Sequence, residues 1–314
     1  MSAGSRRDPL FEHLATTFVH FGLIVLCIVV WAFGVNQPTW LAAFVFLWPA
    51  VAWFDHAMLT RLHEAAHGML TRSRTLNEIL GVAVGTTAFT PLSVYRYVHH
   101  QHHAHLGDEE DPEFWPYNQP SAPRWRRLLY AWLELTIGWI FTPLLYSIRT
   151  AAAWRSIRSR QRTRLIVEWL VLVTFWAALL VIVDRRGWWG FLIVAHLIPA
   201  WLAGTLQTIR KFTEHLGMTG SSILAMTRTV EYRHPIGIAA SRSQLHVDHH
   251  GTHHRWARIP YYELPGVTPK AYAENAEAHT FPNHLSAIMD MVPHLLDPKL
   301  GPQWLRAESD VSVR

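Results

Sequence analysis

Three groups of closely spaced histidines stand out among the side chains of this 314-residue sequence that could do chemistry. The first is His63-Glu-Ala-Ala-His67, in which a continuous helix places His63 and His67 on one face, one turn apart. Two imidazoles on one helix face indicate a metal site. Taken alone, the same string also describes a zinc hydrolase in which Glu64 is the general base.

The second and third groups share one spacing. In each, three histidines stand at i, i+3 and i+4 and can converge from one helical face. The members are His99, His102 and His103 in the second group and His246, His249 and His250 in the third. His100 and His105 point elsewhere in the second group and are expected to be solvated or to support the ligands. No ligand role is predicted for His234, His253 or His254.

One further histidine, His215, directly follows the last apolar segment. Its position alone predicts a ligand role. The alternative is a histidine at a helix end whose imidazole nitrogens bond to water. His20, His56 and His196 lie in or beside apolar segments, where packing or a hydrogen bond is the expected role.

The favoured ligands are nine histidines: His63, His67, His99, His102, His103, His215, His246, His249 and His250. Zinc takes three or four protein ligands, so nine neutral imidazoles fit two first-row ions better than one. The single Cys27 excludes a thiolate-rich site. Iron is expected because it combines imidazole ligation with oxygen activation, with zinc and copper as alternatives. Glu64, Glu214 and Asp248 adjoin ligands and are expected to hold imidazole N–H groups.

The elements that position these histidines are predicted to be membrane helices. Half of the residues are apolar and 16% are charged. Four stretches are long enough to cross a hydrocarbon core, which takes about 20 helical residues. They are residues 18–35, 39–56, 165–183 and 188–209. Asn36-Gln37-Pro38 joins the first pair and Asp184-Arg-Arg-Gly187 the second, so two hairpins open to the same side.

Basic residues identify that side. Arg6 and Arg7 precede the first stretch, and many arginines follow the second, so the open side and both termini are predicted to be cytoplasmic at the cell membrane. Because the basic residues flank apolar segments, lipid headgroups explain the net charge of +5, and no nucleic-acid partner is expected. The first apolar run is too long for a signal peptide and is expected to stay in the mature protein.

Two further apolar segments, residues 76–92 and 128–148, are interrupted by glycine and proline and are expected to be interfacial or re-entrant. The predicted fold class is therefore all-α: an integral membrane protein with four transmembrane helices in two hairpins, interfacial helices and a histidine-rich cytosolic cap. A single domain is expected over residues 1–314, with the cap formed by residues 71–164 and 210–314.

With these residues in view, the chain resembles the membrane fatty acid desaturases, a histidine-box superfamily that includes lipid hydroxylases and carotenoid ketolases. The resemblance rests on three motifs. They are His63-Glu-Ala-Ala-His67-Gly68, Arg96-x-x-His99-x-x-His102-His103 followed by Asp111-Pro112-Glu113-Phe114, and His246-x-x-His249-His250 leading into Ile259-Pro260-x-x-x-Leu264-Pro265. The chain departs from the family at Asp248, where glutamate is common, and at Gly251-Thr-His-His, where an apolar stretch is usual.

The resemblance implies a non-haem di-iron centre at the cytosolic face, with His215 similar to a further family ligand. No segment similar to cytochrome b5 is visible, which implies a separate electron donor of the ferredoxin, rubredoxin or cytochrome type. The predicted function is an O2-dependent oxidation of an unactivated C–H bond of a membrane lipid, with fatty acyl desaturation favoured. Lipid or carotenoid hydroxylation or ketolation is the alternative.

Two rival functions are more distant. An intramembrane zinc protease built on His63, Glu64 and His67 leaves the other two histidine groups unused, and it would bind zinc without iron. A membrane metal carrier would need more ionisable residues within the spans than His20 and His196 supply.

Overall fold

The computed structural model describes residues 10–34, 40–273, 275 and 277–305. Among these residues helices dominate, and the two strands, β1 (Arg228–Val230) and β2 (His279–Phe281), pair in parallel. The predicted all-α class is confirmed. The chain divides into two compact units, and each is built from two separate stretches. Unit 1 is Met1–Ser93 with Ser159–Gly204, and unit 2 is Val94–Arg158 with Thr205–Arg314. The single domain stays a prediction.

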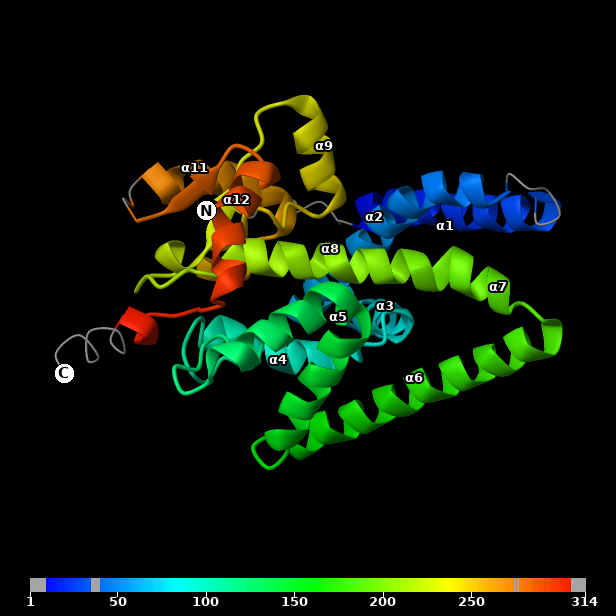
Figure 1. Cartoon of the computed structure of the whole chain (residues 1–314), viewed down its shortest axis with the longest axis horizontal. Coiled ribbons are helices and arrows are strands. Elements are labelled where there is room, and N and C mark those ends of the chain that lie inside the picture. Colours follow the sequence, from blue (N-terminus) through cyan, green and yellow to red (C-terminus); the bar gives the residue numbers. More distant parts are fainter. Residues whose placement is uncertain (1–9, 35–39, 274, 276, 306–314) are drawn as a thin grey trace. The chain divides into compact units, whose positions relative to one another are not determined.

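Unit 1 contains long apolar helices from two parts of the chain. Its elements are α1 (Leu10–Gly34), α2 (Trp40–His67), α3 (Arg74–Thr87), α6 (Ser159–Arg186), α7 (Trp189–Leu192), the π-helical turn η1 (Ile193–Leu197) and the start of α8 (Ile198–His215). Helices α1 and α2 lie side by side (Figure 1) around Cys27, Phe44 and Val51. The Trp48 indole donates to the Val194 carbonyl over 2.8 Å, which ties η1 to α2.

Unit 2 combines the end of α8 with the long helix α5 and several shorter elements. They are most of α4 (Leu92–Ala104), α5 (Arg124–Ala152), η2 (Leu224–Met226), β1, α9 (Pro235–Ser243), α10 (His250–Arg255), η3 (Tyr261–Glu263), α11 (Leu264–Ala273), β2, α12 (His284–Met291) and η4 (Val292–Leu296). Its core includes the fully buried Phe114, Tyr117 and Phe212. Glu134 of α5 forms a buried ion pair with Lys211 of α8 and accepts a 2.8 Å hydrogen bond from the Tyr117 hydroxyl. These contacts hold α5 against α8.

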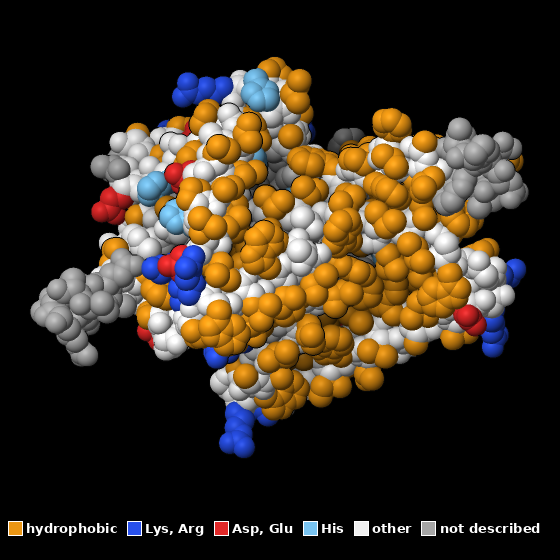
Figure 2. All heavy atoms as spheres, viewed as in Figure 1, with side chains coloured by type: hydrophobic (Ala, Val, Ile, Leu, Met, Phe, Trp, Pro, Cys, Tyr) orange, Lys and Arg blue, Asp and Glu red, His pale blue; other side chains and the backbone are white. Residues whose placement is uncertain are grey.

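Five described helices are long and apolar enough to cross a membrane. They are His13–Gly34, Leu41–His67, Arg124–Ala152, Ser159–Arg186 and Trp189–His215. Apolar side chains cover much of the surface along the long helices (Figure 2), and examples include Phe18 and Phe33 on α1 and Leu170 on α6. Exposed apolar faces of this length suit a hydrocarbon solvent.

Four of the five candidates overlap the four predicted spans, and the fifth, α5, covers the segment predicted to be interfacial. Helix α5 is not regular, because Ile137 leaves helical geometry (φ −130°, ψ 24°) and Pro143 follows within the same helix. Helix α3, over the other predicted interfacial segment, has 14 residues and is too short for a core about 30 Å thick.

The second predicted hairpin turn is present. Helix α6 ends at Arg186, Gly187 adopts φ +67°, and α7 begins at Trp189. A left-handed conformation at this position favours glycine. The predicted turn at Asn36-Gln37-Pro38, and the residues Arg6 and Arg7, lie outside the described residues.

Candidate metal centre

The start of helix α10 decides which histidines of the third group share a face. Helix α10 begins at His250, so His250, His253 and His254 stand at helical spacings i, i+3 and i+4. The preceding Leu245 and His246 have positive φ angles, 55° and 49°, and are not helical. The spacing rule therefore does not apply to the segment from His246 to His249.

Four buried histidines of unit 2 form the first cluster, cluster A: His102, His215, His250 and His254. Each offers one ring nitrogen within 4.8 Å of the others. The Nε2 atoms of His215 and His250 are 2.7 Å apart, and those of His250 and His254 are 3.0 Å apart. The residues come from the ends of α4 and α8 and from α10.

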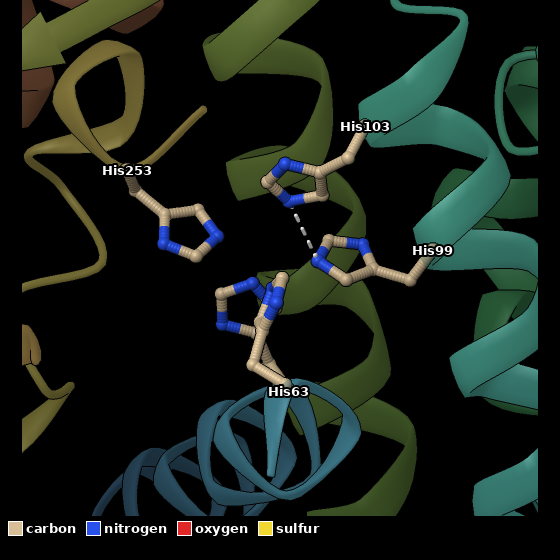
Figure 3. A group of neighbouring side chains, drawn as sticks. His63, His99, His103 and His253 are labelled. Atoms are coloured by element: carbon tan, nitrogen blue, oxygen red, sulfur yellow. Dashed lines mark hydrogen bonds between the residues drawn. The ribbon is translucent and has the colours of Figure 1, made fainter. Parts of the chain in front are cut away.

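A second convergence in unit 2, cluster B, comprises His99, His103 and His253, whose ligand atoms also lie within 4.8 Å of one another. The dashed line in Figure 3 joins the Nε2 atoms of His99 and His103, which are 3.1 Å apart. Helix α4 supplies the first two residues and α10 the third.

The first histidine group lies in unit 1, at the end of α2. His63 and His67 are one turn apart with ring centroids 4.9 Å from each other, as the helical spacing predicts. Gly68, with φ +73°, ends the helix, and the Asn77 side chain donates to the Ala65 carbonyl over 3.0 Å. The end of α2 is thus fixed by its own cap and by α3.

Oxygen acceptors hold the Nδ1 atoms of several clustered histidines. Asp111 lies 2.8 Å from His102 Nδ1, and Glu113 lies 3.2 Å from His99 Nδ1. Because a carboxylate accepts and an imidazole nitrogen beside it donates, these contacts place the proton on Nδ1.

The same arrangement holds for His215, whose Nδ1 lies 3.1 Å from the Met226 carbonyl. Glu214 lies 3.4 Å from His250 Nδ1, which has no hydrogen-bond partner among the described residues. In the three hydrogen-bonded cases the basic Nε2 lone pair is left to face the cluster.

Charge in the site follows from burial. Burial lowers the pKa of the His250 and His254 imidazoles well below the ordinary value and that of His253 to about 3, so these rings are neutral at pH 7. Burial alone raises the pKa of Glu113, but the charge of His102 and the bond from His99 outweigh it and lower the pKa. Neutral imidazoles backed by a carboxylate are the form that binds a metal ion.

The Nε2 atoms that converge in the clusters are 2.7 to 3.1 Å apart, so one cation placed among them would contact both nitrogens of each pair. Two nitrogens bound to one ion, each about 2.1 Å from it, are separated by up to about 4 Å, which suits the clusters. Imidazole donors without thiolates favour a first-row ion. Clusters A and B therefore fit metal binding.

Of the nine histidines predicted as ligands, seven fall in the clusters or in the α2 pair. His246 and His249 do not, and they form a third group with Asp248. His253 and His254 do belong to the clusters, although no ligand role was predicted for them. The sequence carries a signal for them, because His250-Gly-Thr-His253-His254 repeats the i, i+3, i+4 spacing in an overlapping register.

The supporting carboxylates differ in part from those predicted. Glu214 does face His250, but Asp248 bonds Ser241, and the Glu64 Oε1 atom lies 3.7 Å from His63 Nδ1, beyond a hydrogen bond. Asp111 and Glu113 hold imidazoles instead. Both stand in the segment that follows the second histidine group.

Comparison with known proteins gives a match to the fatty acid desaturase family over residues 38–285. A zeaxanthin 4-ketolase of Chlamydomonas reinhardtii is 26% identical over 211 residues, which cover 65% of this chain and 39% of that protein. A delta(9) fatty acid conjugase-like enzyme of Dimorphotheca sinuata is 28% identical over 36% of this chain and 30% of its own length. The chain thus spans less than two thirds of these relatives.

A third relative aligns over more of the chain. The sphingolipid delta(4)-desaturase DES1 of Drosophila melanogaster is 26% identical over 306 residues, or 94% of this chain and 84% of that protein. The names of these relatives include both desaturation and ketolation.

Proposed function

Because the chain belongs to the fatty acid desaturase family, we propose that it is a multi-pass membrane oxidoreductase that uses a di-iron centre and O2 to oxidise an unactivated C–H bond of a lipid. Desaturation of a fatty acyl chain is the favoured outcome. The observation that carries the proposal is cluster A, in which four buried imidazoles converge within the matched region.

The proposed ligands divide between two ions. One ion would be held by His102, His215, His250 and His254. The other would be held by His99, His103 and His253. From their helical spacing and the family resemblance, His63 and His67 of α2 are also proposed as ligands. These are again nine nitrogens, the number expected for two ions with four or five ligands each. Of the third predicted group (His246, His249 and His250), His250 is the one residue among these nine proposed ligands.

The protein's own residues prepare the site for this chemistry. Asp111 and Glu113 fix the tautomers of His102 and His99, and burial keeps the α10 imidazoles neutral. A bound di-iron centre supplies the activation of O2 that an unactivated C–H bond requires. In a desaturation, O2 takes two hydrogens from the acyl chain, with two protons and two electrons from a separate donor, and leaves as two waters.

Cluster A also supports the proposed four-span arrangement. His102 precedes α5, whereas His250 follows α8, and the two residues lie in one cluster of unit 2. An even number of crossings must therefore separate them. If α6 and the α7–α8 run both cross, α5 does not, in agreement with its break at Ile137. We place the clusters and both termini on the cytoplasmic side, following the arginine distribution.

The alternative outcome is hydroxylation or ketolation, and the similarity to a zeaxanthin 4-ketolase supports ketolation. The same metal site serves either outcome, because the position of the substrate carbon decides whether a second hydrogen is removed or oxygen is inserted. Mass spectrometry separates the products, since desaturation removes two hydrogens whereas hydroxylation adds one oxygen.

The test is the lipid profile of a host that expresses the chain, His254→Ala or His105→Ala. The unaltered chain is expected to give an oxidised lipid and to hold about two irons. His254→Ala is expected to reduce the product to background, because cluster A loses a ligand. His105→Ala is the control, because His105 lies outside both clusters on the same histidine-rich segment. Undiminished product from His254→Ala contradicts the site, and a chain that holds zinc without iron contradicts the reaction.

A further inference from the structure

One further group of potential metal ligands is separate from clusters A and B and includes a carboxylate. His246, Asp248 and His249 in unit 2 each offer one ligand atom within 4.8 Å of the others. Asp248 and His249 are buried, with 4% and 7% of their surfaces exposed. Two imidazoles and one carboxylate form a mononuclear donor set that clusters A and B do not have.

The hydroxyl of Ser241 fixes the tautomer of His246. It donates its hydrogen to Asp248 Oδ1 over 2.7 Å, because a carboxylate only accepts. The Ser241 oxygen is also 2.7 Å from His246 Nδ1. Having no second hydrogen, this hydroxyl accepts from His246, which places the ring proton on Nδ1 and leaves Nε2 basic.

Thr268 does the same for His249. Its hydroxyl donates to the Leu264 carbonyl over 2.9 Å and lies 2.9 Å from His249 Nδ1. The Thr268 oxygen therefore accepts from His249, whose Nε2 keeps its lone pair.

Asp248 contributes the negative charge. Its Oδ1 accepts from Ser241, whereas its Oδ2 is buried and has no hydrogen-bond partner among the described residues. The nearby Arg210 guanidinium donates to Glu214 over 3.0 Å and leaves Asp248 Oδ2 without a hydrogen bond from the described part of the chain. A buried carboxylate oxygen without a partner costs free energy, and a bound cation removes that cost.

We propose that His246, Asp248 and His249 bind a third divalent first-row ion that fixes the turn before α10. The turn contains the consecutive positive φ angles of Leu245 and His246, a left-handed conformation that is strained for residues with a side chain and persists only where the surroundings hold it. An ion bound there anchors the chain directly before His250. The proposed role is structural, and it does not depend on which lipid reaction clusters A and B perform.

Zinc binding to the full-length apoprotein tests the proposal, with Zn²⁺ as the only probe and a chromophoric chelator as competitor. Asp248→Asn keeps the shape of the side chain but removes its charge, and it is expected to bind one zinc fewer than the unaltered chain. His249→Gln is expected to give the same loss. His279→Gln is the matched control, because His279 is an exposed histidine of the same unit and is expected to leave the zinc count unchanged.

Two further variants separate this ion from the others. The double variant His102→Ala/His250→Ala removes ligands of cluster A and is expected to retain the ion at Asp248. Ser241→Ala removes the hydroxyl that positions two ligands, and a loss of about 10- to 100-fold in the affinity of one zinc is expected. Equal zinc counts for Asp248→Asn and the unaltered chain, with both folded by circular dichroism, overturn the proposal. The proposal is also overturned if the His102→Ala/His250→Ala variant loses the zinc at Asp248 together with that of cluster A.

Discussion

At the residue scale, the position of each imidazole proton decides what each histidine does. Asp111, Glu113 and the Met226 carbonyl accept from Nδ1 atoms, so the opposite nitrogens face the clusters. Ser241 and Thr268 act in the same way on His246 and His249. The acceptor beside Nδ1 therefore decides which ring nitrogen keeps its lone pair, and neither residue type nor spacing specifies that acceptor.

The buried histidines predict a pH dependence of stability. Burial lowers the pKa of His249 to about 4 and of His253 to about 3, whereas an unfolded histidine titrates near about 6.5. Below about pH 6.5 the unfolded chain binds more protons, so acid favours unfolding. The free energy of unfolding of the apoprotein is expected to fall by up to about 1.4 kcal/mol per histidine for each pH unit down to the folded pKa.

Denaturant unfolding of chelator-treated protein at about pH 7.5 and about pH 5 checks this expectation. Burial raises the pKa of Asp248 to about 6, so this carboxyl opposes the trend between about pH 6 and its unfolded pKa of about 3.9. The variant His249→Gln/His253→Gln is expected to show a shallower pH dependence. Equal or greater stability of the unaltered apoprotein at the lower pH contradicts the prediction.

At the element scale, helix α10 is the element on which both clusters depend. Its first turn contributes His250 to cluster A, and its second contributes His253 and His254 to clusters B and A. Gly251 lies between them in a crowded place, where a Cβ would stand 2.0 Å from the Tyr272 hydroxyl and 2.5 Å from that of Thr227. The backbone of α10 therefore approaches these two side chains more closely than any residue with a Cβ would allow.

Gly251→Ala is expected to displace α10 and to destabilise the protein by about 1–3 kcal/mol, with lower metal occupancy. Gly266→Ala in α11 is the matched control, because its Cβ would meet nothing within 4 Å and alanine favours a helix. Thermal unfolding and metal content of the two variants check the prediction. If both substitutions behave alike, crowding at Gly251 is not what holds α10.

At the scale of the whole molecule, the histidines that meet in unit 2 constrain whether the number of crossings between them is even or odd. A hydropathy reading of the described helices gives five candidates, and length and composition alone do not exclude α5. The convergence of His102 with His250 requires an even number of crossings between them. Side-chain convergence thus constrains topology where apolar length does not.

Cysteine labelling tests the four-span arrangement. With Cys27 replaced by alanine, single cysteines are introduced at exposed positions before α5, after α5, in the last turn of α6 and after α8. The substitutions are Glu110→Cys, Ser156→Cys, Arg185→Cys and Ser221→Cys. An impermeant maleimide is expected to label Arg185→Cys from the side opposite to the other three. If Glu110→Cys and Arg185→Cys react together instead, α5 crosses and the arrangement is wrong.

The sequence by itself determined the all-α class, the second hairpin turn and most of the candidate ligands. Apolar runs and helical spacing are local properties of the chain, and the α2 pair and the α4 histidines obey them. The tertiary structure decided the register of the third histidine group. Two overlapping copies of the spacing run from His246 to His254, and only the copy that begins at His250 is helical. Where a helix begins depends on contacts with distant residues such as Thr229, whose hydroxyl accepts from the Gly251 amide over 3.0 Å.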